Sequence, residues 1–261
     1  MKETKKILIT VKTYPTPSKK YDELVCTAGI TEDGKWIRLY PIEFRKLPYD
    51  KQYKKYDWVE VVVERNDSDF RKESFRPISE CKIVKSIGTE NNWAERRAVL
   101  KNVKTYTNLK KLIADSKTPN FKSLALFKPT KIIDFIYEEQ DPNWSREENK
   151  QLELFFSKDF KRVEKLPFKF KYVFEDDEGK TSKLSITDWE IGALFLKYKK
   201  DHKLACQKVK EKYFDDFAHK KDLHFFLGTT KDHHNTARNP FIIIGTFHPN
   251  KTVEDKQGIL F

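Results

Sequence analysis

Five short runs of strand-forming residues between positions 5 and 88 constrain the fold of this chain more than any other feature. Apolar and polar residues alternate in some runs, and Val and Ile dominate others, which are both patterns typical of β-strands. The turn at 32–35, EDGK, joins two of the runs as a hairpin. So many short strands in so few residues predict a small closed sheet. A five-stranded oligonucleotide-binding (OB) barrel is the natural candidate.

The rest of the chain predicts helices in the middle and then a second block of strands. Thr187 and Glu190 form a Thr-x-x-Glu pattern, which predicts a capping box at the start of a helix. A loop and short helix are expected at 141–156, and an extra strand or loose tail at 251–261. The fold class is therefore α+β, mostly β, with two small OB-like β-barrels joined and flanked by helices. We expect an N-terminal barrel at 1–90, a helical or mixed connector at 91–164 and a C-terminal barrel-like domain with inserted helices at 165–261.

The run KWIRLYPI contains the strongest candidate binding residues. Because side chains alternate along a strand, Ile37 and Leu39 face a core while Trp36, Arg38 and Tyr40 share the other face. Two rings and a guanidinium suit a nucleobase and a phosphate. The structural alternative is an aromatic ladder with a solvated arginine, which stabilises many sheets. The sequence leaves both interpretations open.

Further aromatic and basic residues are interleaved in the first block and just after it. They can form a charged groove with stacking platforms, as in proteins that bind single strands. The alternative is that the lysines are solvated loop charges. The residues in this wider set are Tyr14, Arg45, Tyr49, Tyr53, Lys54, Lys55, Tyr56, Phe75 and Arg76, with Trp93, Arg96 and Arg97 at the start of a helix.

The charge balance favours an anionic partner. The chain carries 52 Lys and Arg against 40 Asp and Glu, a net charge of +12. Such a field attracts polyanions, of which nucleic acid is the first candidate. No apolar run reaches the 18 or so residues of a membrane span, so we expect a cytoplasmic protein with no membrane partner. The three cysteines match neither a zinc spacing nor a disulfide framework, and we expect no cofactor.

Several segments together resemble a bacterial family with a dual OB-fold domain. They are KTYPTPS, KWIRLYPI followed by Phe44 and Arg45, QYKKYDWVEV, TDWEIG and FFLGT…NPFIIIGTFHP. The resemblance implies two OB-like barrels and nucleic-acid binding, often in antiviral defence. The resemblance implies Cys and His around the turn at 176–183, where this chain has acidic residues and lysines. The resemblance therefore implies that a metal site there is absent or altered.

An enzymatic alternative depends on histidines near the C-terminus. His224, His234 and His248 lie within 25 residues and can approach one another across a hairpin. Converging histidines can bind a metal ion, although this spacing matches no known zinc or nuclease motif. Asp188 and Glu190 are better explained as the first turn of a helix than as catalytic carboxylates.

These observations predict a nucleic-acid-binding protein, with single-stranded DNA or RNA as the favoured ligand and the barrel face as the site. The enzyme question stays open and leans towards no catalysis. One alternative is a metal-dependent nuclease or phosphodiesterase that uses the three histidines. A second is a protein-interaction subunit of a bacterial defence system.

Overall fold

The computed structural model describes residues 1–261 except 18–22, 118, 146–147, 149–162 and 253–261. The fold is α+β and mostly β, with 38% strand and 23% helix, as predicted. Most of the short helix expected at 141–156 and of the segment 251–261 lies outside the described residues. No helix in the described part of the chain has the length and apolar character needed to cross a membrane.

The N-terminal block contains a closed five-stranded barrel, as expected. Four of the five predicted runs supply barrel strands, while the fifth barrel strand, Ser74–Pro77, was not predicted and the run at 80–87 forms a strand outside the barrel. The barrel strands pair in the order β1-β4-β5-β7-β6 and back to β1, with β5 and β7 parallel. This connectivity is that of an OB barrel. The strands of the barrel sheet are β1 (Lys2–Lys12), β4 (Thr27–Thr31), β5 (Trp36–Leu39), β6 (Asp57–Arg65), β7 (Ser74–Pro77) and an appended β8 (Lys82–Ser86). Between them lie the short hairpin β2 (Thr16–Pro17) and β3 (Glu23–Leu24), and the 3-10 helices η1 (Phe44–Lys46) and η2 (Tyr49–Lys51).

The second half contains one seven-stranded sheet where we expected a second small barrel. Its order is β11-β12-β13-β15-β14-β10-β9, and no pairing between described strands joins its two ends. The strands are β9 (Thr105–Tyr106), β10 (Leu124–Phe127), β11 (Lys131–Glu139), β12 (Phe168–Glu175), β13 (Thr181–Ile186), β14 (His224–Thr229) and β15 (Phe241–Phe247). Three of these strands, β9 to β11, come from the segment expected to be a connector, so the sheet spans residue 165.

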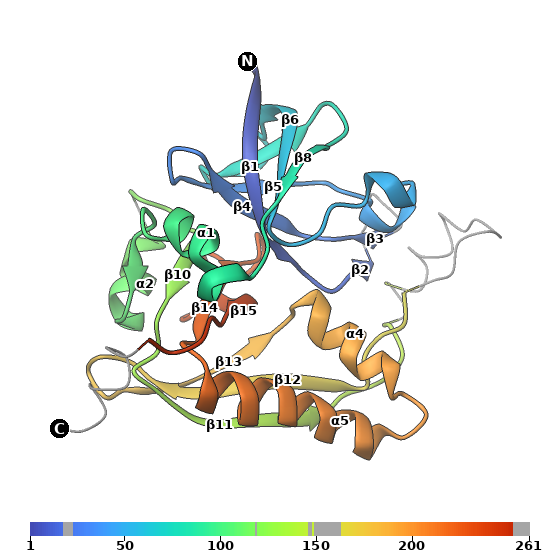
Figure 1. Ribbon diagram of the computed structural model, residues 1–261, viewed down its shortest axis with the longest axis vertical. Coiled ribbons are helices and arrows are strands. Elements are labelled where there is room, and N and C mark those ends of the chain that lie inside the picture. The colour runs from blue at the N-terminus through green and yellow to red at the C-terminus, as the bar shows by residue number, and fades with distance from the viewer. Residues whose placement is uncertain (18–22, 118, 146–147, 149–162, 253–261) are drawn as a thin grey trace.

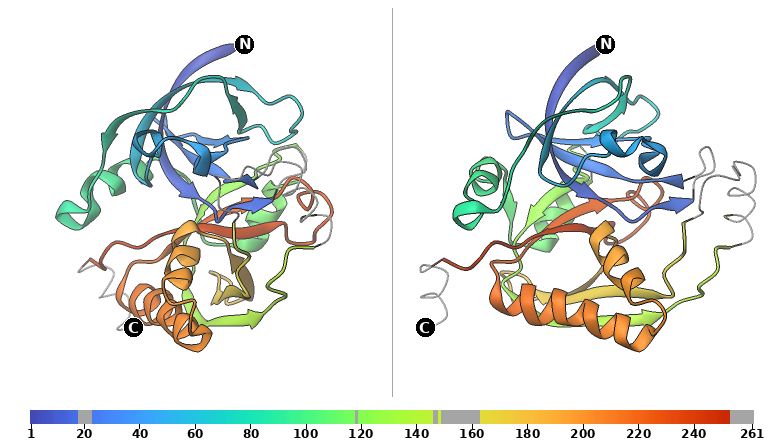
Figure 2. Two further views of the ribbon diagram at one scale, coloured as in Figure 1. Left: turned by 90° about the vertical axis from the view of Figure 1, so that its right-hand side faces the viewer. Right: turned by 45° about the vertical axis from the view of Figure 1, so that its right-hand side comes forward.

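The helices lie around the second sheet and beside the barrel (Figures 1 and 2). They are α1 (Glu90–Leu100), α2 (Leu109–Asp115), α4 (Trp189–Lys197), α5 (His202–Lys210) and η3 (Glu211–Ala218), a π-helical continuation of α5. The capping box predicted at the start of α4 is wrong. Asp188 is the N-cap residue and makes no side-chain cap hydrogen bond, because its carboxylate pairs with Lys55 from the barrel.

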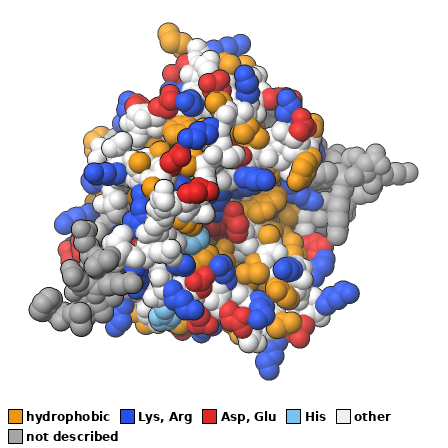
Figure 3. Space-filling model, viewed as in Figure 1, with side chains coloured by type: hydrophobic (Ala, Val, Ile, Leu, Met, Phe, Trp, Pro, Cys, Tyr) orange, Lys and Arg blue, Asp and Glu red, His pale blue; other side chains and the backbone are white. Residues whose placement is uncertain are grey.

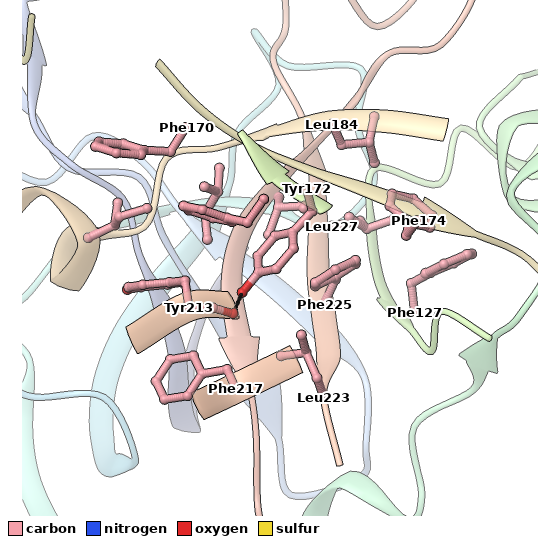
Figure 4. Packing of buried hydrophobic residues seen from close by; sticks show 14 of the residues in the cluster. Phe127, Phe170, Tyr172, Phe174, Leu184, Tyr213, Phe217, Leu223, Phe225 and Leu227 are labelled. Atoms are coloured by element: carbon pink, nitrogen blue, oxygen red, sulfur yellow. Dashed lines mark hydrogen bonds between the residues drawn. The ribbon is translucent and has the colours of Figure 1, made fainter. Parts of the chain in front are cut away.

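Aromatic side chains fill the core between the second sheet and the helices α4, α5 and η3 (Figure 4). Tyr172 is fully buried there, and its hydroxyl donates to the carbonyl of Tyr213 at 2.6 Å. Each such ring contributes about 2–3 kcal/mol by leaving water. A second cluster joins the two halves, with Leu8 and Ile30 from the barrel packed with Phe226 and Ile244 from the second sheet. The barrel and the second sheet therefore share a continuous apolar interface.

Candidate functional site

The strand face predicted to bind nucleic acid is covered by the second half of the chain. Ile37 and Leu39 lie in the barrel core, as the alternation predicted. On the other face, Trp36 packs edge to face against Phe226 at 5.8 Å. Arg38 is only 2% exposed, and Tyr40 is 36% exposed. The expectation of an open strand face is therefore wrong for Arg38, which lies against the second sheet.

Arg38 links the barrel to the second sheet. Its guanidinium donates to the hydroxyl of Ser123 at 2.7 Å, to the carbonyl of Ser123 at 3.3 Å and to the carbonyl of Thr229 at 3.4 Å. Burial lowers its pKa, and the nearby positive charge of Arg71 lowers it further. In this arrangement the guanidinium bonds to protein groups rather than facing solvent.

Other residues of the predicted set also have structural partners. The Tyr14 hydroxyl donates to the carbonyl of Glu164 at 2.6 Å. A Cβ at Gly192 would lie 2.1 Å from the Tyr14 ring, so only glycine allows α4 to approach this closely. Arg45 pairs with the buried Glu23 at 2.5 Å. Arg76 stays half-exposed, with its nearest ion-pair partner, Glu64, at 3.7 Å.

The structure does not bring the three histidines together as a metal site. His234 is buried between the hydroxyl of Thr229 and the carbonyl of Ser116. His224 is near the carbonyl of Asp222, while His248 stacks on an aromatic ring elsewhere. Within the described ranges, no group of three His, Cys, Asp or Glu side chains is placed to hold a metal ion.

A central cleft lies between the barrel, α1, α4 and the continuous helix formed by α5 and η3. Its volume is about 880 Å³. Figure 3 shows acidic and basic side chains side by side at the centre of this face, with a histidine nearby. Five residues of the predicted set line it, namely Lys54, Lys55, Tyr56, Trp93 and Arg96. Its described lining comprises the cations Lys12, Lys54, Lys55, Arg96, Lys208 and Lys212, the acids Asp188, Glu190 and Glu211, the rings Tyr56, Trp93, Trp189, Tyr213, Phe217 and His248, and also Leu194 and Thr246.

An ion cluster lies at one side of the cleft. The Lys55 ammonium contacts a carboxylate oxygen of Asp188 and one of Glu190, each at 2.5 Å. Burial alone would lower the pKa of Lys55, but the attraction of the two carboxylates outweighs it and raises that pKa. Burial raises the pKa of Asp188 despite Lys55. Glu190 has its pKa lowered to about 2, because Lys55 and a hydrogen bond with Asp188 outweigh the effect of burial.

Two aromatic residues in the cleft have a left-handed backbone. Tyr56 has φ 68° and Trp93 has φ 62°, a region that bulky residues rarely adopt. Their rings meet edge to face at 5.8 Å. The Arg96 guanidinium carbon lies 3.8 Å from the Tyr56 ring centre and 4.6 Å from that of Trp93. Strained backbone of this kind is concentrated at functional sites, so this wall marks the cleft as a candidate site.

His248 forms another part of the cleft and stacks on Phe217, with ring centres 3.6 Å apart. Burial, followed by the positive charge of Lys55, lowers its pKa to about 3. The unfolded chain would bind a proton near pH 6.5, so between these two values it carries more protons than the folded chain. Stability should therefore fall as the pH falls through this window.

We expect the free energy of unfolding to fall by up to about 1.4 kcal/mol per pH unit from this group. Urea unfolding between pH 7 and 4 measures it. His248→Gln should flatten the dependence, while the same change at the exposed His219 should not. Identical pH dependence in the wild type and His248→Gln would contradict the assignment.

Several cleft residues were missed by sequence reasoning. Lys12 is the last residue of β1 and is buried. Its place at the end of an otherwise apolar alternation was the one local sign that it could line a site. Asp188 and Glu190 lie at the start of a helix, as expected. Both also pair with Lys55, which is 133 residues from Asp188 in the sequence. Lys208 and Lys212 were not among the predicted residues. Only tertiary structure brings these groups together.

Family comparison covers most of the chain. Residues 104–261 match the family described as "Domain of unknown function (DUF8757)". The chain belongs to this family. Residues 3–102 match a second family, described as "Domain of unknown function (DUF8758)". The boundary between the two matches falls just after α1.

Comparison with curated proteins finds no match. Among solved structures, one described as "Structure of murine DNA binding protein bound with ds DNA" aligns with 11% sequence identity and a TM-score of 0.30. The alignment covers 97% of this chain and 96% of that one.

Proposed function

We propose that this protein binds single-stranded nucleic acid, with an unpaired base in the central cleft. The observation that carries the proposal is the wall formed by Tyr56, Trp93 and Arg96, in which the half-buried Trp93 ring and the Arg96 guanidinium stand over the buried Tyr56 ring. Proteins that bind single strands hold the unpaired bases by stacking them on aromatic rings and on Arg guanidinium groups. The site thus differs from the strand face that the sequence suggested.

The charge of the cleft supports the same partner. Six cationic and three acidic side chains line it among the described residues, and the whole chain carries +12. A surplus of lysine and arginine around aromatic rings suits a base with its flanking phosphates. A volume of about 880 Å³ leaves room for a base and its sugar. An unpaired strand is favoured because a base inside a duplex cannot enter such a cleft.

Binding should weaken steeply with salt, because each neutralised phosphate releases counterions. Fluorescence anisotropy with labelled single-stranded DNA and RNA, across salt concentrations, measures this. Trp93→Ala should cost about 1–3 kcal/mol of binding, the contribution of one stacking ring. Lys54→Met should lower the salt slope by about 0.7 if it contacts one phosphate.

Lys82→Met provides the matched control, because Lys82 is exposed on β8, outside the cleft. Its binding and salt slope should equal those of the wild type. Thermal melts of each variant separate loss of binding from loss of fold. If the wild type binds no single-stranded DNA or RNA at low salt, the proposed function is wrong. Membership of the resembled dual OB-fold family, and with it a role in defence, stays a prediction.

A further inference from the structure

Glu190 is an unexpected residue for a cleft that attracts phosphates. Its side chain is 49% exposed and lines the cleft, with one carboxylate oxygen in contact with Lys55 and the other available to a ligand. Its ionised carboxylate repels a phosphate and can only accept hydrogen bonds. A ligand that uses it must therefore present N–H or O–H donors. In a nucleic acid the bases carry such donors on their edges, and the phosphates do not.

Lys12 offers the opposite chemistry a short distance away. Its side chain is buried, and its ammonium donates to the carbonyl of Tyr53 at 3.2 Å, above the rings of Phe44 and Trp189. Within the described ranges, no carboxylate lies at ion-pair distance from it, and its pKa is lowered by burial. An ammonium has three donors, so donors remain for a ligand in the cleft.

The backbone fixes Lys12 and Glu190 near one another. Thr13 forms an isolated antiparallel bridge with Asp188, and the amide of Tyr14 donates to the carbonyl of Thr187 at 2.7 Å. Lys12 adjoins Thr13, and Glu190 lies two residues after Asp188. Burial lowers the pKa of Lys12, and the negative charge of Glu190 opposes that effect. The cleft thus presents an acceptor and a donor on adjacent segments of its lining.

We propose that the central cleft selects guanine, with the Glu190 carboxylate accepting from N1–H and the N2 amino group and the Lys12 ammonium donating to O6. The inference rests on the proposed function. Guanine places two adjacent donors beside a carbonyl, and a carboxylate next to an ammonium complements that edge. Adenine and cytosine each place a single amino group beside a ring acceptor, and thymine and uracil offer one N–H between two carbonyls. Those four bases leave part of the acceptor and donor set unpaired.

The test uses single-stranded oligo-dT with one central position varied among dG, dA, dC, dT and deoxyinosine. Anisotropy titrations at constant salt compare the five strands. We expect the dG strand to bind about tenfold to a hundredfold more tightly than the dA, dC and dT strands. Deoxyinosine, which lacks only the N2 amino group, should lose about tenfold.

Glu190→Gln separates recognition from general binding. The variant should lose the preference for dG over deoxyinosine while still binding oligonucleotide, and a thermal melt checks its fold. Lys82→Met, outside the cleft, should keep the full preference. Equal affinity for all five strands overturns guanine selection and leaves the proposed function standing. Absence of binding to every strand contradicts the proposed function, and guanine selection fails with it.

Discussion

Replacing Lys55 with methionine should lower the free energy of unfolding by about 3–5 kcal/mol, the usual cost of removing one partner of a buried ion pair. The Asp188 side chain is only 2% exposed and would keep its burial without the ammonium that pairs with it at 2.5 Å. An uncompensated buried carboxylate must either take up a proton or draw in water, and both cost stability. The cluster also joins the barrel to α4, so its loss loosens the wall of the cleft.

Urea unfolding followed by circular dichroism measures this change as a shift in midpoint at constant slope. Lys54→Met is the matched control, because the neighbouring Lys54 is exposed and its loss should change stability by no more than about 0.5 kcal/mol. The double variant Lys55→Met/Asp188→Asn should recover part of the loss, since it also removes the unpaired acid. If Lys55→Met is as stable as Lys54→Met, the ion cluster does not hold the two halves together.

Replacing Arg38 with methionine should lower the free energy of unfolding by about 3 kcal/mol. Three hydrogen bonds from the guanidinium reach Ser123 and Thr229, and a hydrogen bond to a charged group contributes about 1.5–3 kcal/mol. Removing a buried charge also saves the cost of keeping it out of water, so the net loss is smaller than the sum of the three bonds. The Ser123 hydroxyl is left buried without this donor. The loss should appear as weaker docking of the barrel on the second sheet.

The same urea experiment measures the effect, with Arg76→Met as control. Arg76 is half-exposed and its ion pair with Glu64 is long, at 3.7 Å, so its removal should change stability by less than about 1 kcal/mol. Oligonucleotide binding gives a second readout. If Arg38→Met stays as stable as the wild type but loses oligonucleotide binding, the strand face with Trp36, Arg38 and Tyr40 is the binding site after all.

Local patterns in the sequence predicted a closed barrel and four of its five strands. Alternation placed Ile37 and Leu39 in the core, and five short strands with a tight turn predicted closure. These patterns depend only on residues that are close in the sequence, so they can be recognised in a single sequence. The same alternation correctly put Trp36 and Arg38 on the opposite face. It could not show that Phe226, Ser123 and Thr229 would cover that face from 85 or more residues away.

The cleft was harder to predict because its groups come from distant segments. Lys55 was predicted to bind nucleic acid, with a solvated loop charge as the alternative, and only the fold places it against Asp188. Trp93 and Arg96 were noted as an aromatic and basic pair, yet their contact with Tyr56 depends on how α1 packs on the barrel. The second half formed one large sheet because β9 to β11 pair with later strands, and such pairings leave no local signature.

Hydrogen exchange with and without a single-stranded oligonucleotide of mixed sequence tests the central claim most directly. We expect ligand to slow amide exchange in the segments that line the cleft, at 52–57, 90–100 and 188–197, because a bound strand restricts their local opening. Exchange in β8, which lies outside the cleft, should not change. Protection confined to β8 or to other surfaces away from the cleft, with the three lining segments unchanged, would contradict nucleic-acid binding in the central cleft.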